Sequence, residues 1–358
     1  MTQDKKNVIV FDTAAESSGA LSVLQGFYQE ALEDKSINWI FVVSTPDLDE
    51  SDNIKVLKFP QTKKSWFHRL YFDLFTAPKL AKIYKADCIL SLQNLTIRSG
   101  SLPQIVFLHQ PIPFCQKKFS LFKAPTLWIY QNVISRMILS SAKKADKIVV
   151  QTKWMKDALA AMAGCDKEKI SQIPPHIPSA LDKKFDNSTV NYKNFFYPAT
   201  PVLYKNHNAI LQAAKILMSE GIGDFSLNLT LNPDSPIARK FILEGVNINP
   251  LGMVSEERMC ELYSKNVVVF ASYLESFGYP LLEARMFKAP ILASDMPFSR
   301  EILDGYENAR FFNPDTPQEL ASLMKECILG KFRYTRTQDN FSMDNAGWRN
   351  VINLIKEL

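Results

Sequence analysis

The sequence lacks the features of a membrane-spanning or exported protein. Its longest apolar runs, such as VIVF and NVVVFAS, are the length of a strand and far short of the ~20 residues that a membrane helix needs. The first residues, MTQDKKNVIVFD, show no apolar stretch followed by a small-residue cleavage site, so no signal peptide is visible. We therefore expect a cytoplasmic protein.

Cysteine and histidine are few and scattered. The five cysteines form no CxxC pair, and their number is odd, so a cytoplasmic chain of this kind is expected to keep them as buried free thiols. The four histidines are isolated from one another, which excludes the spacing of a zinc site.

Charge is modest overall but unevenly distributed. The residues are 46% hydrophobic and 22% charged, a composition that excludes a disordered or fibrous chain. The length of 358 residues is enough for two domains, each with its own core. Residues 1–180 carry 23 Lys and Arg against 16 Asp and Glu, a net charge of +7, whereas residues 181–358 carry 19 against 21, a net charge of −2. We expect only the first half to meet an anionic surface.

Short β-branched runs alternate with longer helical patterns in the first half, as in a parallel, doubly wound sheet. The strands are predicted at 8–11, 39–44, 56–59, 88–92, 105–109 and 147–152, and the helices at 17–33, 66–84, 126–141 and 153–163. Residues 171–194, rich in Pro, Asn and Lys, follow as a predicted linker.

The second half repeats this alternation. Its strands are predicted at 195–197, 226–231, 246–248, 267–271, 290–293 and 309–312. Helix starts are indicated by Ser255 before two glutamates and by a capping box from Thr316 to Glu319. The sequence predicts an α/β fold of two Rossmann-like domains, 1–180 and 181–340, with a C-terminal helix at 341–358 packing back on the first. Two such domains are expected to face each other across a cleft that binds ligands.

The segment ASYLESFGYPLLEARMFKAPILASD (271–295) is the richest in chemical information. A buried strand ends, a loop follows, and Pro280 stands at the predicted start of a helix, where its missing N–H costs nothing. The N–H groups of Phe277, Gly278, Tyr279 and Leu281 are expected to be free, which is typical of a phosphate site.

Two glutamates flank this predicted anion site. A carboxylate would repel phosphate, so Glu275 and Glu283 are expected to accept hydrogen bonds from hydroxyl groups, and a nucleotide sugar offers hydroxyls on both sides of its phosphates. The alternative is that both carboxylates merely stabilise the positive end of the helix. Spacing alone leaves both interpretations open.

These residues resemble the signature of the retaining glycosyltransferases of family 4 (group 1), which have the GT-B fold and include enzymes of bacterial polysaccharide and lipopolysaccharide biosynthesis. The resemblance rests on Glu275 and Glu283 with Phe277, Gly278 and Pro280 between them. The flanking runs LGMVSEERMCELYSKNVVVFAS and KAPILASDMPFSREIL, and FFYPATPVLYKNHNAILQAAKIL upstream, resemble the family as well.

The resemblance implies a role for each matching residue. Glu283 binds the donor ribose, Glu275 contacts the donor sugar beside its reacting carbon, and Lys205 neutralises the diphosphate. The remaining donor contacts are assigned to Gly19, Ser276, Phe277, Gly278, Tyr279 and Leu282. Many members carry an arginine shortly before the lysine, where this chain has PATP (198–201).

Residues at predicted strand ends in the first half are assigned to the acceptor side. The HQPIPF run places His109 at the end of a strand and resembles a subset of the family in which this histidine contacts sugar or acceptor, so His109 joins Glu275 and Lys205 as a catalytic candidate. Gln93 and Asn94 end another strand and are predicted to line the acceptor side. Gly19, at a strand-to-helix turn, resembles a reduced form of the family's glycine-rich loop.

No metal or other cofactor is expected. Asp47-Leu48-Asp49 matches the Asp-x-Asp string of metal-dependent GT-A enzymes, but it lies in the acidic run PDLDESDN without an apolar strand around it, which indicates a solvated loop. The GT-B resemblance needs no metal.

Two basic, aromatic-rich segments, 63–85 and 117–147, account for the positive charge of the first half. They carry six and seven Lys or Arg against one Asp each. Such segments can lie on an anionic membrane, which would place the protein on the inner face of the plasma membrane. Alternatively their aromatic side chains belong to the core. Nucleic acid is not expected, because no motif for it is present.

The sequence therefore predicts a retaining glycosyltransferase that moves a hexose or related sugar from a nucleoside diphosphate to a glycan or lipid-linked acceptor. Two alternatives stay open, a sugar-nucleotide epimerase on the same fold and a non-catalytic two-domain sugar-binding protein. An epimerase would need further acid and base residues, and the two glutamates count against a binding protein.

Overall fold

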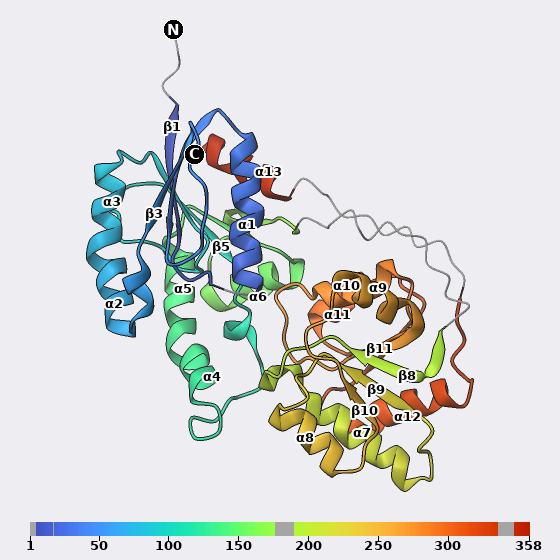
Figure 1. Ribbon diagram of the computed structural model, residues 1–358. Coiled ribbons are helices and arrows are strands. Elements are labelled where there is room, and N and C mark those ends of the chain that lie inside the picture. The colour runs from blue at the N-terminus through green and yellow to red at the C-terminus, as the bar shows by residue number, and fades with distance from the viewer. Residues whose placement is uncertain (1–4, 17, 176–189, 336–346) are drawn as a thin grey trace. The chain divides into compact units, whose positions relative to one another are not determined.

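A computed structural model describes residues 5–16, 18–175, 190–335 and 347–358 of the chain (Figure 1). The described residues divide into two compact units. The first contains residues up to 175 and the C-terminal helix, and the second contains residues 190–335. Each unit is built around its own parallel sheet, so the predicted α/β fold of two Rossmann-like domains is confirmed.

Seven parallel strands form the sheet of the first unit, in the order β3-β2-β1-β4-β5-β6-β7. Their bounds are Lys6–Asp12 (β1), Ile37–Val43 (β2), Ile54–Lys58 (β3), Cys88–Ser91 (β4), Gln104–Leu108 (β5), Lys147–Val150 (β6) and Ile170–Gln172 (β7). The first six follow the order of a doubly wound sheet, with its crossover between β1 and β4. Strand β7 overlaps the predicted linker, which was wrong at this end.

The helices of the first unit are α1 (Ser18–Glu33), α2 (Trp66–Tyr71), α3 (Ala77–Ile83), α4 (Pro125–Ile129), α5 (Ser135–Lys144), α6 (Lys153–Ala163) and α13 (Gly347–Glu357). Two π turns, η2 (Phe72–Thr76) and η4 (Tyr130–Ile134), interrupt the two helices that were predicted in the basic segments. Such turns insert a residue and often mark functional regions.

Strands that are covered on both faces explain the apolar runs of the sequence. Val8, Val10 and Phe11 of β1 are fully buried, as expected of a parallel sheet with helices on both sides. Helices α1 and α13 cover one face, and η2 and α3 cover part of the other.

The C-terminal helix α13 lies beside α1 (Figure 1). Trp348 packs against Phe27 and Phe107, with ring centroids 5.6 and 4.9 Å away, and covers Gly26 so closely that a Cβ there would lie 2.6 Å from its indole nitrogen. Lys356 forms an ion pair with Asp34 at 2.6 Å. Residues 341–346 of the predicted helix lie outside the described residues.

The second unit has six parallel strands in the order β10-β9-β8-β11-β12-β13, which is the same doubly wound order. Their bounds are Asn191–Tyr197 (β8), Ser226–Leu229 (β9), Ile248–Pro250 (β10), Asn266–Phe270 (β11), Ile291–Ser294 (β12) and Ala309–Phe312 (β13). Strand β8 begins within the predicted linker, and β10 starts two residues later than predicted.

The helices of the second unit are α7 (His207–Ser219), α8 (Pro236–Leu243), α9 (Glu256–Lys265), α10 (Tyr279–Met286), α11 (Pro297–Ile302) and α12 (Pro317–Ile328). Ser255 caps α9 by accepting the N–H of Arg258 at 3.3 Å, which confirms the predicted start. The predicted capping box at Thr316 is wrong, because its side chain makes no cap bond and Glu319 accepts the N–H of Asn313 instead.

Candidate functional site

The loop after β11 leads into the N-terminus of α10 and leaves backbone donors unused. Among the described residues, the N–H groups of Phe277, Gly278 and Tyr279 have no hydrogen-bond partner. The N–H groups of Leu281 and Leu282 both donate to the Gly278 carbonyl, at 2.9 and 3.3 Å. The prediction of a free Leu281 N–H is therefore wrong, but three consecutive donors remain at the positive end of a helix, as an anion requires.

Position 278 requires a glycine because of its backbone conformation. Its φ is +97°, in the region that favours glycine, and it is the N-cap of α10. A Cβ there would make only ordinary contacts, the closest at 3.7 Å to Leu281, so crowding is not the reason. Leu282 is buried and has no free N–H, so its predicted place in the donor site rests on the resemblance alone.

Lys205 forms an ion pair with Glu275, which lies two residues before the free N–H groups in the sequence. Lys205 Nζ lies 2.6 Å from Glu275 Oε1, and the side chains are 14% and 13% exposed. Lys205 ends a short 3-10 turn, η8 (Leu203–Lys205), and its ammonium group also lies over the Tyr204 and Phe270 rings, at 5.8 and 6.0 Å. A pair this sheltered from water is costly to break unless each charge finds a new partner.

Buried hydrogen bonds hold the Lys205 turn against the Glu275 loop. The Tyr197 hydroxyl at the end of β8 donates to the Lys205 carbonyl at 2.5 Å and lies 3.0 Å from Ser272 Oγ. The Tyr273 N–H donates to the Tyr204 carbonyl at 2.8 Å. Both loops follow the carboxyl ends of neighbouring strands, β8 and β11, where doubly wound sheets bind ligands.

Glu283 is the fifth residue of α10, just beyond its first turn. It accepts a hydrogen bond from the Tyr263 hydroxyl at 2.6 Å, and partial burial raises the pKa of its carboxyl group above the usual range. The neighbouring Ser276 is half-buried. The structure thus brings Lys205, Glu275, Glu283 and the α10 N-terminus into one unit.

Two of the predicted acceptor-side residues, Asn94 and His109, are joined by a hydrogen bond. Asn94 Oδ1 accepts the N–H groups of His109 and Gln110, at 2.8 and 3.0 Å. The His109 ring packs at 5.9 Å on the edge of Phe107, its Nδ1 is buried without a partner among the described residues, and burial lowers its pKa to about 4. His109 is therefore neutral at physiological pH.

Gln93 and Gly19 lie elsewhere on the same sheet edge. Gln93 is buried and accepts the Thr13 N–H and hydroxyl through its Oε1, at 3.3 and 3.2 Å. Gly19 lies in the first turn of α1 rather than in the turn before it and is exposed, and a Cβ at this position would have no atom within 4 Å.

Asp12 is a buried carboxylic acid that the sequence analysis missed. It ends β1, has no exposed surface, and accepts the Ala15 N–H at 3.1 Å through Oδ1, while Oδ2 has no partner among the described residues. Burial raises its pKa to about 7. The sequence signal was an acidic residue directly after the apolar run VIVF, at the predicted carboxyl edge of the sheet.

A second missed group surrounds Gln93. Asp73 pairs with Arg69 at 2.9 Å and accepts a long hydrogen bond of 3.5 Å from Gln93 Nε2. Burial raises the pKa of Asp73, and Arg69 opposes this shift. This network connects the η2 turn with the ends of β1 and β4, which only the tertiary structure reveals.

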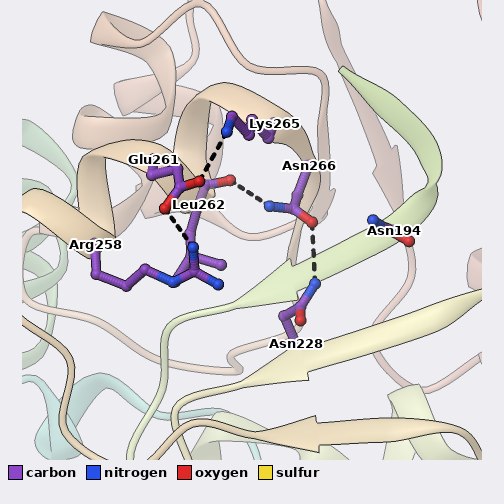
Figure 2. Close-up of a pocket in the computed structure, with 7 residues that line it drawn as sticks. All are labelled: Asn194, Asn228, Arg258, Glu261, Leu262, Lys265 and Asn266. Atoms are coloured by element: carbon purple, nitrogen blue, oxygen red, sulfur yellow. Dashed lines mark hydrogen bonds and ion pairs between the residues drawn. The ribbon is translucent and has the colours of Figure 1, made fainter. Parts of the chain in front are cut away.

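Figure 2 shows a polar pocket lined by residues of β8, β9, α9 and β11. Its volume is about 170 Å³. It is lined by Asn194, Asn228, Arg258, Glu261, Leu262, Lys265 and Asn266. Asn228 donates to Asn266 at 3.0 Å, and Asn266 donates to the Leu262 carbonyl at 2.7 Å. Both cations of the pocket pair with Glu261. These groups satisfy one another, so we assign the pocket a structural role.

The two basic segments expose apolar side chains. Exposed members are Trp66, Phe67, Leu70, Tyr71, Leu74, Phe75, Ile83, Leu121, Phe122, Ile129, Tyr130, Val133 and Met137, with Phe67 84% and Phe122 95% exposed. Residues of α2 and η2 line a largely apolar groove of about 620 Å³. The alternative that these aromatics form the core holds for Phe72 and Phe119, which are buried, but not for most of them.

The remaining expectations concern metals, thiols and membrane helices. Asp47 is exposed and pairs with Lys58, as expected of a solvated loop. No group of three metal-ligating side chains occurs within the described ranges, and the same ranges contain no helix long and apolar enough to cross a bilayer. All five cysteines are free, and four of them are buried, with Cys165 half-buried.

Two family models match the chain in the order of its units. The model described as Glycosyltransferase Family 4 matches residues 30–180, and the model described as Glycosyl transferases group 1 matches residues 239–342.

Curated relatives include mannosyltransferases. The O-antigen chain mannosyltransferase RfbU of Salmonella typhimurium is 25% identical over 246 residues, which is 65% of this chain and 67% of RfbU. The serotype-specific mannosyltransferase WbdA of Escherichia coli is 36% identical over 76 residues, 21% of this chain. The matched part spans only 9% of the length of WbdA.

Solved structures share the fold along the whole chain. WaaG, a glycosyltransferase involved in lipopolysaccharide biosynthesis, superposes with a TM-score of 0.69 at 13% identity, covering 98% of this chain and 99% of WaaG. Anabaena Alr3699/HepE in complex with UDP and glucose superposes with a TM-score of 0.67 at 15% identity, covering 99% and 100%. At these identities the matches establish the fold alone.

Proposed function

We propose, from the premise that this chain belongs to the group 1 glycosyltransferases, that it transfers a hexose from a nucleoside diphosphate to a glycan or lipid-linked saccharide with retention at the anomeric carbon. One observation carries the proposal. The second unit gathers Lys205, Glu275, Glu283 and three free N–H groups on two neighbouring loops at the carboxyl edge of its sheet. A cation and helix N–H groups suit a diphosphate, and carboxylates suit sugar hydroxyls.

The proposed mechanism uses the donor's own diphosphate as the base. The bond from the anomeric carbon to the diphosphate oxygen breaks, the bond to the acceptor oxygen forms on the same face, and the acceptor proton passes to the diphosphate. Lys205 and the N–H groups of residues 277–279 stabilise the negative charge that develops on the leaving group. Glu275 orients the donor sugar, and neutral His109 contacts the acceptor side. No step requires a metal ion.

Mannose is the first donor sugar to test. Both curated relatives described above are named mannosyltransferases, and RfbU acts on an O-antigen chain. We therefore place the chain in cell-surface polysaccharide synthesis, with nucleoside diphosphate mannose tested before glucose and galactose donors.

The decisive experiment is an assay of nucleoside diphosphate release from a panel of nucleotide sugars, with and without saccharide acceptors. We expect release from one donor, and a loss of at least ~100-fold in Lys205→Ala and Glu275→Ala. If no donor is bound or consumed, or if both variants keep full activity, the transferase proposal fails.

We also propose that segments 63–85 and 117–147 bind an anionic membrane surface. The support is their net positive charge together with their exposed aromatic and aliphatic side chains. Flotation with liposomes that contain anionic lipid should recover the protein at low salt. Phe67→Ser and Phe122→Ser should reduce recovery, whereas Leu243→Ser, equally exposed in the second unit, should not. Equal flotation with neutral liposomes, or none with anionic ones, would contradict the proposal.

A further inference from the structure

A buried tyrosine is bonded to the carboxylate that is assigned to ribose. The Tyr263 hydroxyl on α9 donates to Glu283 Oε2 on α10 at 2.6 Å, and Tyr263 is only 1% exposed. Glu283 Oε1 has no hydrogen-bond partner among the described residues. One oxygen of the carboxylate is thus held by the protein while the other is free to meet a ligand.

The Tyr263 ring cannot easily change position. It stacks on Phe287 with centroids 5.5 Å apart and an interplanar angle of 21°, and it makes a T-shaped contact with Phe196, with centroids 5.4 Å apart and an interplanar angle of 73°. These neighbours come from the end of α10 and from β8, so the hydroxyl is fixed by the core of the unit. A donor fixed in this way restrains the carboxylate that accepts from it.

We infer that Tyr263 is a positioning residue that aims the free oxygen of Glu283 at a ribose diol and thereby sets the preference for a ribonucleotide. The inference rests on the proposed function, since it deepens the role of Glu283 there. Tyr263 does not touch the ligand. It acts by restricting the rotation of the Glu283 carboxylate and by keeping it a hydrogen-bond acceptor.

The groups around Glu283 shift the pKa of its carboxyl group in opposite directions. Burial and the nearby Glu256 carboxylate raise the pKa of Glu283, whereas the Tyr263 hydrogen bond lowers it. Burial, and then the charge of the nearby Glu283 carboxylate, raise the pKa of the Tyr279 phenol. Losing the Tyr263 hydroxyl therefore moves the pKa of Glu283 further up, and a protonated Glu283 accepts hydroxyl protons poorly.

The test compares the binding of UDP and GDP with that of their 2′-deoxy and 3′-deoxy forms by titration calorimetry. Wild-type protein should prefer the ribonucleotide, and Tyr263→Phe should lose roughly tenfold in ribonucleotide affinity with little change for the deoxy forms. The acid limb of ribonucleotide binding should also move to higher pH in Tyr263→Phe. A purely structural tyrosine would weaken all forms equally and leave the pH profile unmoved.

Two variants accompany this comparison. Tyr306→Phe removes another buried hydroxyl, which donates to the Ala289 carbonyl at 2.8 Å, and should keep both the ribose preference and the pH profile. Glu283→Gln should lose the preference and the acid limb together. Thermal melts check that each variant is folded, and the phenylalanine in Tyr263→Phe keeps the ring contacts.

The outcomes separate the inference from the proposed function. If Tyr263→Phe or Glu283→Gln keeps the full ribose preference, the inference is overturned while the transferase proposal stands. If wild-type protein binds neither nucleotide and consumes no nucleotide sugar, the proposed function falls and this inference falls with it.

Discussion

Asp12→Asn should change how the stability of the first unit depends on pH. Burial raises the pKa of this carboxyl group from 3.8 to about 7, although Arg69 and Lys63 lie near enough to lower it. Oδ1 is satisfied by the Ala15 N–H, and Oδ2 has no partner among the described residues. An ionised Oδ2 is therefore poorly compensated, so the folded chain holds a proton there that the unfolded chain has released.

The sign and size of the effect follow from this difference. Between the unfolded pKa near 4 and the folded pKa near 7, the folded state binds more protons, so the free energy of unfolding falls as pH rises. The complete shift corresponds to roughly 4 kcal/mol, and the part lost between pH 5 and pH 8 is roughly 2.5 kcal/mol. Asparagine cannot ionise. Between pH 5 and pH 8, the free energy of unfolding of the variant should therefore rise by that amount relative to wild type.

Urea unfolding at pH 5 and pH 8 measures this gain, with fluorescence of the buried Trp39 reporting on the first unit. Burial lowers the pKa of His109 to about 4, so this residue makes the free energy of unfolding rise with pH in the acid range. Its contribution is the same in both proteins and cancels when they are compared. Asp47→Asn, at an exposed carboxylate, is the control and should show no such gain. Parallel pH profiles for wild type and Asp12→Asn, or a carbon-13 titration of Asp12 with a midpoint below about 5, would refute the reasoning.

Three further predictions concern single contacts. Gly278→Ala puts a Cβ on a backbone at φ +97°, which costs roughly 1–2 kcal/mol, so calorimetry should show weaker UDP or GDP binding. Gly26→Ala places a Cβ 2.6 Å from Trp348, so indole fluorescence should change and urea unfolding should show a loss of roughly 1–3 kcal/mol. Lys205→Met leaves the Glu275 carboxylate without its cation, so the melting temperature should fall, and adding Glu275→Gln should restore most of the loss.

Gly223→Ala is the matched control for both glycine substitutions. Gly223 is exposed, its φ is not positive, and no atom lies within 4 Å of a Cβ there, so fluorescence, stability and nucleotide binding should stay close to wild-type values. Unchanged nucleotide binding in Gly278→Ala, an unmoved Trp348 signal in Gly26→Ala, or no recovery of the melting temperature when Glu275→Gln is added to Lys205→Met would each contradict the corresponding prediction.

The fold class could be predicted because it depends on local patterns. Buried strands of a parallel sheet appear in the sequence as runs of apolar residues, and the helices between them show apolar residues at helical spacing. Short edge strands escape this logic. Strand β7 has three residues with one fully buried side chain, Ile170, and it exists because β6 offers it a partner.

The candidate site likewise combines local features, which the sequence predicts, with long-range contacts, which it does not. The loop and helix start at 277–280 are local, so Gly278 and Pro280 predicted an N-terminus with free donors. The tight turn that uses the Leu281 N–H depends on the Gly278 conformation, which sequence does not specify. The Tyr263 bond to Glu283 joins residues twenty positions apart through the packing of α9 on its sheet, and no spacing rule in a single sequence reveals it.

The Lys205–Glu275 pair bears on how a donor would enter and leave. On the proposed roles, the diphosphate replaces Glu275 as the partner of Lys205, so Lys205 stays compensated and the cost falls on Glu275. An intact nucleotide sugar offers hydroxyl groups to the released carboxylate, whereas the nucleoside diphosphate product does not. Reformation of the Lys205–Glu275 ion pair therefore weakens the binding of the product more than the binding of the substrate. The same contact that shields two charges in the free protein would then assist release of the product after transfer.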